Sequence, residues 1–206
     1  MKTAPDEMQP AAVPERATQA GEASPKEWEW VERQVWTERM LEALEKGVKG
    51  GVWFSLIDKV QRPSTLYAAW VGVERNGGSA GSDHQSIEAF EKDLAGEIER
   101  LSEELRTGTY RPRPIRRVYI DKLGSKEKRP LGIPCVRDRV VQGALRIVIE
   151  PIFENVFVPQ SYGFRPGRGC KDALRKLESL LKAGYTHVVD ADLKAYFDSI
   201  PHAPLL

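Results

Sequence analysis

A segment at 188–198 carries the residue types that bind metal ions and nucleotides. It reads Val188-Val189-Asp190-Ala191-Asp192-Leu193-Lys194-Ala195-Tyr196-Phe197-Asp198. A β-branched run that ends in carboxylates is typical of a strand that delivers acidic groups to a metal site, because Mg²⁺ prefers such oxygen ligands. The aromatic pair that follows can form the wall of a nucleotide pocket. By itself, an aspartate after a strand is more often a cap or turn residue, and Phe197 can equally be a core aromatic.

The stretch from Arg111 to Arg129 is strongly basic. It holds eight Lys or Arg residues and two acidic residues, a local balance of +6, whereas the whole chain has a net charge of +1. Such a stretch suits a phosphate-rich partner, and it equally describes a charged face that only contacts solvent. Charge alone leaves both interpretations open. Residues 121–128 are rich in Gly, Ser and Lys, which indicates the exposed tip of a hairpin.

Two further motifs, one basic and one glycine-rich, read Lys128-Arg129-Pro130-Leu131-Gly132-Ile133-Pro134 and Ser161-Tyr162-Gly163-Phe164-Arg165-Pro166-Gly167-Arg168. In order and spacing, these motifs and the Asp-Leu-Lys-Ala-Tyr-Phe run at 192–197 resemble the N-terminal half of the reverse transcriptases that bacterial group II introns encode. The resemblance extends from about Leu66 to the end of the chain. It implies an RNA-directed DNA polymerase with a maturase role, whose partners are group II intron RNA, an RNA/DNA template-primer and dNTPs.

The resemblance also assigns roles to single residues. Asp192 would be catalytic and would bind both Mg²⁺ ions of the complete enzyme, and the carbonyl of Leu193 would be the next metal ligand. Phe197 would pack under the sugar of the nucleotide and exclude a 2′-hydroxyl group, which selects dNTPs. Lys122 and Arg129, which flank the hairpin tip, would neutralise the triphosphate, with Arg offering a bidentate fork and Lys a point charge.

Four arginines are assigned to the nucleic-acid backbone by the same resemblance. They are Arg116, Arg117, Arg165 and Arg168. Arginines in this role pair with phosphates and carry little sequence information. One departure concerns Asp121, because most relatives have proline at this position and a carboxylate beside a triphosphate site disfavours nucleotide binding.

Composition limits the class of protein. The chain has 206 residues, of which 41% are hydrophobic, so that it can bury the core of one ordinary domain. Cys135 and Cys170 have no CxxC spacing, which fits free thiols in a reducing compartment. No apolar run approaches the ~20 residues of a membrane span, and the first residues lack the apolar core of a signal peptide. These features predict a soluble, cytoplasmic protein with no membrane partner.

The pattern of apolar residues, Gly and Pro predicts three regions. Residues 1–26 form a disordered leader, 27–63 an N-terminal helical segment, and 64–206 the reverse transcriptase domain. Within the last two, helical spacing predicts helices over 28–44, 66–73, 87–105, 137–153 and 170–181, and Ser86 is a candidate N-cap. Shorter alternating runs predict strands over 115–120, 129–133 and 186–193.

Helices and strands without regular βαβ alternation predict an α+β fold. By resemblance, this fold is the fingers subdomain and the start of the palm of a right-hand polymerase. One carboxylate by itself is not enough to hold two metal ions. We therefore expect the chain as given to be truncated and inactive as a polymerase by itself. A non-catalytic RNA-binding fragment and a poorly folding pseudogene product are the alternatives.

Overall fold

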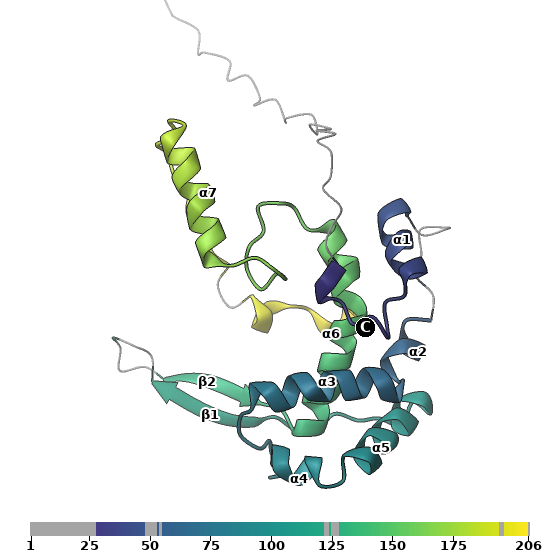
Figure 1. Cartoon of the computed structure of the whole chain (residues 1–206). Coiled ribbons are helices and arrows are strands. Elements are labelled where there is room, and N and C mark those ends of the chain that lie inside the picture. The colour runs from purple at the N-terminus through teal and green to yellow at the C-terminus, as the bar shows by residue number, and fades with distance from the viewer. Residues whose placement is uncertain are drawn as a thin grey trace, which may run out of the picture.

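The computed structural model describes residues 28–47, 53, 55–121, 124, 128–193 and 196–205. Within them, helices predominate and the one sheet is a two-stranded antiparallel hairpin, which agrees with the predicted α+β class. Helix α6 runs through the middle of the molecule, α3 crosses it, and the hairpin projects to one side (Figure 1). The predicted leader at 1–26 lies outside the described residues.

The helices and strands largely follow the predicted ranges. They are η1 (Trp28–Trp30), α1 (Glu38–Lys46), α2 (Ile57–Val60), α3 (Pro63–Asn76), α4 (Ile87–Glu91), α5 (Leu94–Arg106), β1 (Arg116–Asp121), β2 (Lys128–Ile133), α6 (Val136–Val156), α7 (Cys170–Lys182), η3 (Phe197–Ser199) and α8 (His202–Leu205). The predicted helices at 66–73, 137–153 and 170–181 and the two hairpin strands are confirmed. Both cysteines are free, as expected.

The core lies where α3, α4, α5 and α6 meet. Trp70 of α3 stacks on Phe90 of α4, with ring centroids 5.0 Å apart and planes inclined by 20°. Both side chains are buried, and burying a large apolar side chain stabilises a fold by about 1.5–3 kcal/mol. At the crossing of α3 and α6, a Cβ atom on Gly143 would lie 3.1 Å from the Cβ of Ala69, so the glycine permits the close approach of the two helices.

The N-terminal segment is hydrogen-bonded to α6 at a backbone carbonyl that Pro151 leaves without a helical donor. Pro151 has no N–H group and cannot donate the helical hydrogen bond to the carbonyl of Ile147. The indole N–H of Trp36 donates to this carbonyl instead, at 3.0 Å, and Trp36 is completely buried. Residues 28–47 therefore share one core with α3 and α6.

Two predicted helices differ from the structure. The segment 28–44 is a single 3₁₀ turn at Trp28–Trp30 followed by turns, and its α-helix begins only at Glu38. Most of its apolar residues are buried as expected, but Trp30 is 37% exposed. The helix expected over 87–105 is two helices, α4 and α5, separated at Asp93. The Asp93 carboxylate lies over the first turn of α5, where a Cβ atom on Gly96 would be 2.5 Å from it. The N-cap role of Ser86 is confirmed, because its Oγ accepts from the Ala89 N–H at 3.1 Å.

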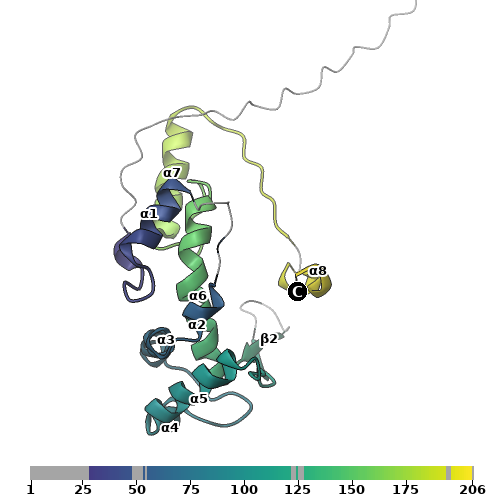
Figure 2. The same cartoon turned by 90° about the vertical axis from the view of Figure 1, so that its right-hand side faces the viewer.

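The predicted strand at 186–193 is wrong. The backbone there forms no ladder with either described strand, and Val188 and Val189 are 73% and 93% exposed. β1 and β2 pair only with each other, so a β-branched run without a neighbouring edge stays unpaired. Figure 2 shows this segment running from α7 towards α8, apart from the helical body.

Helix α7 has the predicted bounds but no buried residues, and its leucines at 174, 177 and 181 are 63%, 45% and 51% exposed. The periodic pattern therefore formed a helix without a packed face among the described residues. None of the helices that the structure describes has the length and apolar character needed to cross a bilayer.

The pairing of Trp36 with the carbonyl freed by Pro151 gives a stability prediction. Trp36→Phe keeps an aromatic ring but leaves the Ile147 carbonyl without a donor, so we expect the free energy of unfolding to fall by about 1–3 kcal/mol. In a Pro151→Ala background, the new N–H at 151 can satisfy this carbonyl, and the same substitution should cost about 1 kcal/mol less. Urea unfolding of the four proteins measures this coupling, and equal costs in both backgrounds would contradict it.

Candidate nucleic-acid interface

The hairpin sorts its side chains onto two faces. β1 and β2 pair with Arg117 opposite Gly132, Tyr119 opposite Pro130, and Asp121 opposite Lys128. Successive strand residues alternate between faces and directly paired residues share one, so these residues form a single surface, which we call the tyrosine face. The opposite surface, which we call the apolar face, carries Arg116, Val118, Ile120, Arg129, Leu131 and Ile133.

The tyrosine face combines an exposed aromatic ring with cations. Tyr119 is 58% exposed, and Arg117 and Lys128 lie exposed near it on the two strands. The Lys128 ammonium is 3.8 Å from the Asp121 carboxylate, an exposed ion pair worth at most about 1 kcal/mol. Aromatic rings between basic side chains bind single-stranded nucleic acid by stacking and phosphate contacts. Tyr119 was not among the residues predicted from the sequence, although the alternation of Arg117 and Tyr119 was a usable signal.

The apolar face places two of the predicted arginines at its two ends. Arg129 lies opposite Ile120 and Arg116 opposite Ile133, with partly exposed Val118 and Leu131 between them. The Nε atom of Arg116 is covered by protein and has no hydrogen-bond partner within the described part of the chain. Lys122, the other residue predicted to neutralise a triphosphate, lies outside the described residues.

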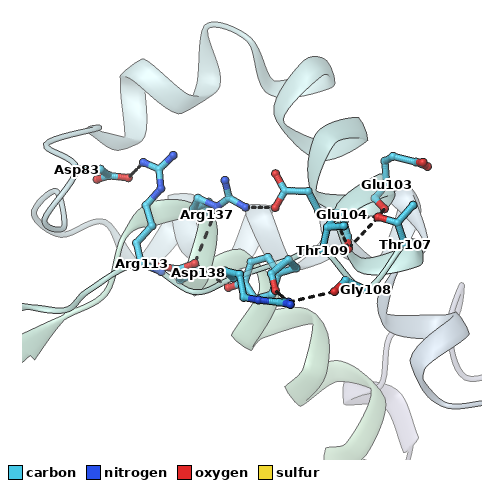
Figure 3. Close-up of polar contacts among 11 residues, drawn as sticks. Asp83, Glu103, Glu104, Thr107, Gly108, Thr109, Arg113, Arg137 and Asp138 are labelled. Atoms are coloured by element: carbon cyan, nitrogen blue, oxygen red, sulfur yellow. Dashed lines mark hydrogen bonds and ion pairs between the residues drawn. The ribbon is translucent and has the colours of Figure 1, made fainter.

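The base of the hairpin is held by Asp138, a buried residue in the first turn of α6. Its Oδ1 accepts from the Tyr110 hydroxyl at 2.7 Å, and its Oδ2 accepts from the backbone N–H of Arg113 at 3.0 Å. Burial, followed by the hydrogen bond to Asp138, raises the pKa of Tyr110 well above its usual value, so the hydroxyl stays a donor throughout the neutral range. Asp138 thereby holds the segment that leads into β1 against the start of α6, and Figure 3 shows it beside Arg113.

Arg137 forms a second layer of the same cluster. Its guanidinium pairs with Glu104 of α5 and lies 5.6 Å from the centroid of the Tyr110 ring, while its Nε is 4.0 Å from Asp138 Oδ1. Figure 3 shows Arg137 between Glu104 and Asp138. The arginine therefore joins α5 to the start of α6, and its charge offsets that of the buried Asp138 carboxylate.

Arg165 occupies an internal position rather than a surface. Its side chain is buried, its Nε and Nη2 donate to the Glu154 carboxylate, and its Nη1 donates to the carbonyls of Ser161 and Val158 at 3.2 and 3.4 Å. The guanidinium also lies 4.7 Å from the centroid of the Phe157 ring. All three nitrogens thus have partners inside the protein, and this conformation leaves no fork for a phosphate. We therefore assign Arg165 a structural role.

Arg168 differs from Arg165 in that it is exposed. One nitrogen donates to the carbonyl of Pro159, and the rest of the guanidinium faces solvent. Gly167 has a φ of 64°, which lets the chain turn between the two arginines. Arg168 thus remains available for a phosphate contact.

Asp192, Leu193 and Phe197 lie on the exposed segment after α7. Asp192 Oδ1 accepts from the Leu193 N–H at 2.9 Å, and Leu193 and Phe197 are 70% and 83% exposed. Tyr196 contacts Phe197 edge-on, with centroids 5.3 Å apart. No group of three or more His, Cys, Asp or Glu side chains that could hold a metal ion occurs among the described residues. The described residues therefore do not complete a metal site around Asp192.

The structure brings only part of the predicted site together. Arg116, Arg117 and Arg129 share the hairpin, whereas Arg168 lies on the loop before α7 and Asp192 on the segment after it. Hydrogen bonds and ion pairs between these three groups are absent from the described part of the molecule. The hairpin is therefore the assembled portion of the interface.

Comparison with known proteins finds one matching family model and several similar proteins. Residues 120–206 match the model of the family "Reverse transcriptase (RNA-dependent DNA polymerase)". The chain is 38% identical over 147 residues to the group II intron-encoded protein LtrA of Lactococcus lactis subsp. cremoris, an alignment that covers 70% of this chain and 24% of that protein. It is 46% identical over 117 residues to protein YkfC of Escherichia coli K12, covering 55% and 30% of the two chains.

A plant protein, the mitochondrial nuclear intron maturase 1 of Arabidopsis thaliana, is 37% identical over 67 residues, which cover 32% of this chain and 9% of that protein. The chain is thus similar to the reverse transcriptases of group II introns and to their maturase relatives. The match spans about a quarter of the length of LtrA. Reverse transcriptases generally use divalent metal ions, which agrees with the type of ligand that Asp192 offers.

The two arginines of the Ser161–Arg168 motif can be told apart by stability. Arg165→Ala leaves the largely buried Glu154 carboxylate without its partner, so we expect the free energy of unfolding to fall by about 3 kcal/mol. Arg168→Ala is the matched control, and removing this exposed side chain should change stability by less than about 0.5 kcal/mol. Urea unfolding of both variants measures the difference, and similar values would show that Arg165 is no more structural than Arg168.

Proposed function

We propose that this chain supplies the fingers subdomain and the start of the palm of a group II intron reverse transcriptase, an RNA-directed DNA polymerase of the cytoplasm. The same protein would bind its intron RNA as a maturase. The observation that carries the proposal is the exposed hairpin, where Arg117, Tyr119 and Lys128 share one face. The similarity to LtrA supports it, because LtrA is named as a group II intron-encoded protein.

The nucleic-acid surface would consist of cations on the hairpin and on the loop before α7. Arg116, Arg117 and Arg168 would contact backbone phosphates, and Tyr119 would stack on an unpaired base. Arg165, which pairs with Glu154, is left out of this surface. The template-primer and the intron RNA are both polyanions, so the same cations would serve either partner.

The nucleotide would bind between the hairpin and the segment that follows α7. Arg129 and Lys122 would contact the triphosphate of a dNTP, and Phe197 would exclude the 2′-hydroxyl of an rNTP. Asp192 and the carbonyl of Leu193 would be ligands of Mg²⁺, the divalent ion that favours carboxylate oxygens and substrate phosphates. When bound, two such ions would supply charge stabilisation to the transferred phosphoryl group.

A non-catalytic RNA-binding role is the second candidate. It is favoured by one observation, namely that the hairpin is assembled whereas the described residues near Asp192 form no metal-binding group. Such a protein would retain the phosphate contacts without nucleotide addition. Primer extension separates the two functions, while RNA binding is common to both.

The RNA-binding surface is tested by salt dependence. We expect residues 1–206 to bind structured RNA with an affinity that falls steeply between 50 and 200 mM salt, because each neutralised phosphate releases counterions. Replacing Arg116, Arg117 and Arg129 together by Ala should reduce the slope of log K against log salt by about two units. Fluorescence anisotropy with a labelled RNA hairpin measures both quantities.

The matched control removes the same charge away from the hairpin, by replacing Arg33, Arg100 and Arg106 with Ala. These arginines pair with acidic neighbours on the surface, at 2.8, 3.0 and 2.6 Å. Their loss should leave the salt slope within about half a unit of that of the unmodified chain. Equal effects of the two triple variants would assign binding to net charge and refute the hairpin surface.

The polymerase proposal is tested by reconstitution. Residues 1–206 are mixed with a polypeptide that supplies the remaining length of LtrA, and RNA-templated DNA synthesis is measured with Mg²⁺ and dNTPs. Asp192→Asn keeps the shape but removes the ligand charge, so we expect activity to fall about a hundredfold or more. Asp190→Asn is the neighbouring control and should retain most activity. Full activity with Asp192→Asn would overturn the metal-ligand assignment.

The same mixture tests whether Phe197 excludes the 2′-hydroxyl of an rNTP. Phe197→Val should preserve dNTP use and admit rNTPs, because a smaller side chain leaves room for the 2′-hydroxyl. The ratio of rNTP to dNTP incorporation is the readout, and an unchanged ratio would place Phe197 elsewhere in the protein.

A further inference from the structure

We propose that Asp138 is a positioning residue that fixes the orientation of the basic hairpin relative to α6. It acts through Tyr110 and Arg113, which belong to the connector at 107–115 between α5 and β1. The proposal rests on the proposed function in one respect, namely that the hairpin is what contacts RNA. The contact itself is a property of the described structure.

The two ends of the hairpin are attached to α6 in different ways. β2 ends at Ile133 and is followed by Pro134 and by Cys135, the N-cap of α6, so this end is linked covalently to the helix. β1 is preceded by residues without helix or strand structure. Orientation at this end therefore depends on side-chain contacts, and Asp138 supplies two of them.

Asp138 is suited to this role by its burial and its position. Its side chain is 4% exposed, and its two carboxylate oxygens accept from two different residues of the connector. A carboxylate in the first turn of a helix also interacts favourably with the helix dipole. Hydrogen bonds to a charged acceptor are about twice as strong as those between neutral groups. The two hydrogen bonds to Asp138 therefore hold the connector strongly against α6.

A second support comes from the loop before α4. Asp83 pairs with the guanidinium of Arg113 at 2.7 Å, and Ser82 Oγ donates to the carbonyl of Pro114 at 2.5 Å. Gly81 lets this loop pass against the start of α6, because a Cβ atom there would lie 2.5 Å from the Cα of Cys135. Arg113 is thus held on both sides, by Asp138 through its backbone and by Asp83 through its side chain (Figure 3).

A small tilt at the base of the hairpin moves its tip by several ångströms. A strand of six residues is about 20 Å long at ~3.3 Å per residue, so a tilt of about 10° at its base moves its far end by about 3 Å. Such a displacement exceeds the tolerance of a hydrogen bond to a phosphate. The side chains at the far end, such as Arg129, therefore depend on the connector for their position although they do not touch it.

The test uses the whole chain and two measurements on the same variants. In Asp138→Asn, the amide oxygen can still accept from the Arg113 N–H, but the Tyr110 hydroxyl now faces an N–H donor and has to reverse its hydrogen bond. Both contacts then lack a charged acceptor and are weaker. We expect amide hydrogen exchange over 113–121 and 128–133 to become roughly tenfold faster while exchange in α3 is unchanged. Affinity for the RNA hairpin should fall roughly three- to tenfold with the salt slope unchanged, because the phosphate contacts are displaced rather than removed.

Tyr110→Phe is the second variant, and it removes only the hydroxyl arm. It should show a smaller change in the same direction, and it carries the test if Asp138→Asn does not fold. Ser86→Ala is the control, because it removes a comparable side-chain contact to backbone at α4 without touching the connector. Its hairpin exchange and RNA affinity should match those of the unmodified chain.

Two results would overturn the proposal. One is unchanged hairpin exchange in Tyr110→Phe and in folded Asp138→Asn, and the other is a reduced salt slope in Asp138→Asn, which would make Asp138 part of the binding surface itself. Failure of the proposed function looks different. In that case the triple variant at Arg116, Arg117 and Arg129 leaves RNA binding unchanged, while the exchange measurement still decides the role of Asp138.

Discussion

Polar groups of α6 that are shielded from solvent need a hydrogen-bond or ion-pair partner. Other parts of the chain supply these partners, and these contacts attach them to the helix. In its first turn, the Asp138 carboxylate accepts from the connector before β1. In its second half, the Ile147 carbonyl, which Pro151 leaves without a helical donor, accepts from Trp36. Near its end, Glu154 pairs with Arg165. One helix thus organises the hairpin, the N-terminal segment and the loop before α7.

Local patterns were sufficient for those parts of the fold whose stability is local. Helical spacing gave α3, α6 and α7 nearly to their bounds, and the Gly, Ser and Lys-rich run between two alternating segments gave the hairpin. The break at Asp93 was missed, because an aspartate inside a charged helical face looks like a solvent residue until Gly96 is seen beneath it. The strand at 186–193 was wrong for a different reason, since a strand needs a paired edge and its own sequence does not supply one.

The candidate site was predictable only in part, for the same reason. Residue types in motifs gave Arg116, Arg117 and Arg129, which the hairpin gathers, but they did not reveal that Arg165 faces inward to Glu154. Tyr119 became a candidate once the pairing register put it beside Arg117 and Lys128. Asp138 gave no signal in the sequence, because its two partners lie 28 and 25 residues away and meet it only in the folded chain.

The basic stretch from Arg111 to Arg129 illustrates why charge counting has to be corrected by structure. Arg111 donates to the carbonyls of Gly108 and Tyr110, and Arg113 pairs with Asp83, so both serve the connector. The cations that remain exposed on the strands are Arg117, Lys128 and Arg129. The described part of this basic stretch thus contains both arginines that hold the hairpin in place and cations that the hairpin presents to solvent. Because an internally paired guanidinium cannot neutralise a phosphate without breaking its contacts, we expect Arg111 and Arg113 to add little to the number of phosphates bound.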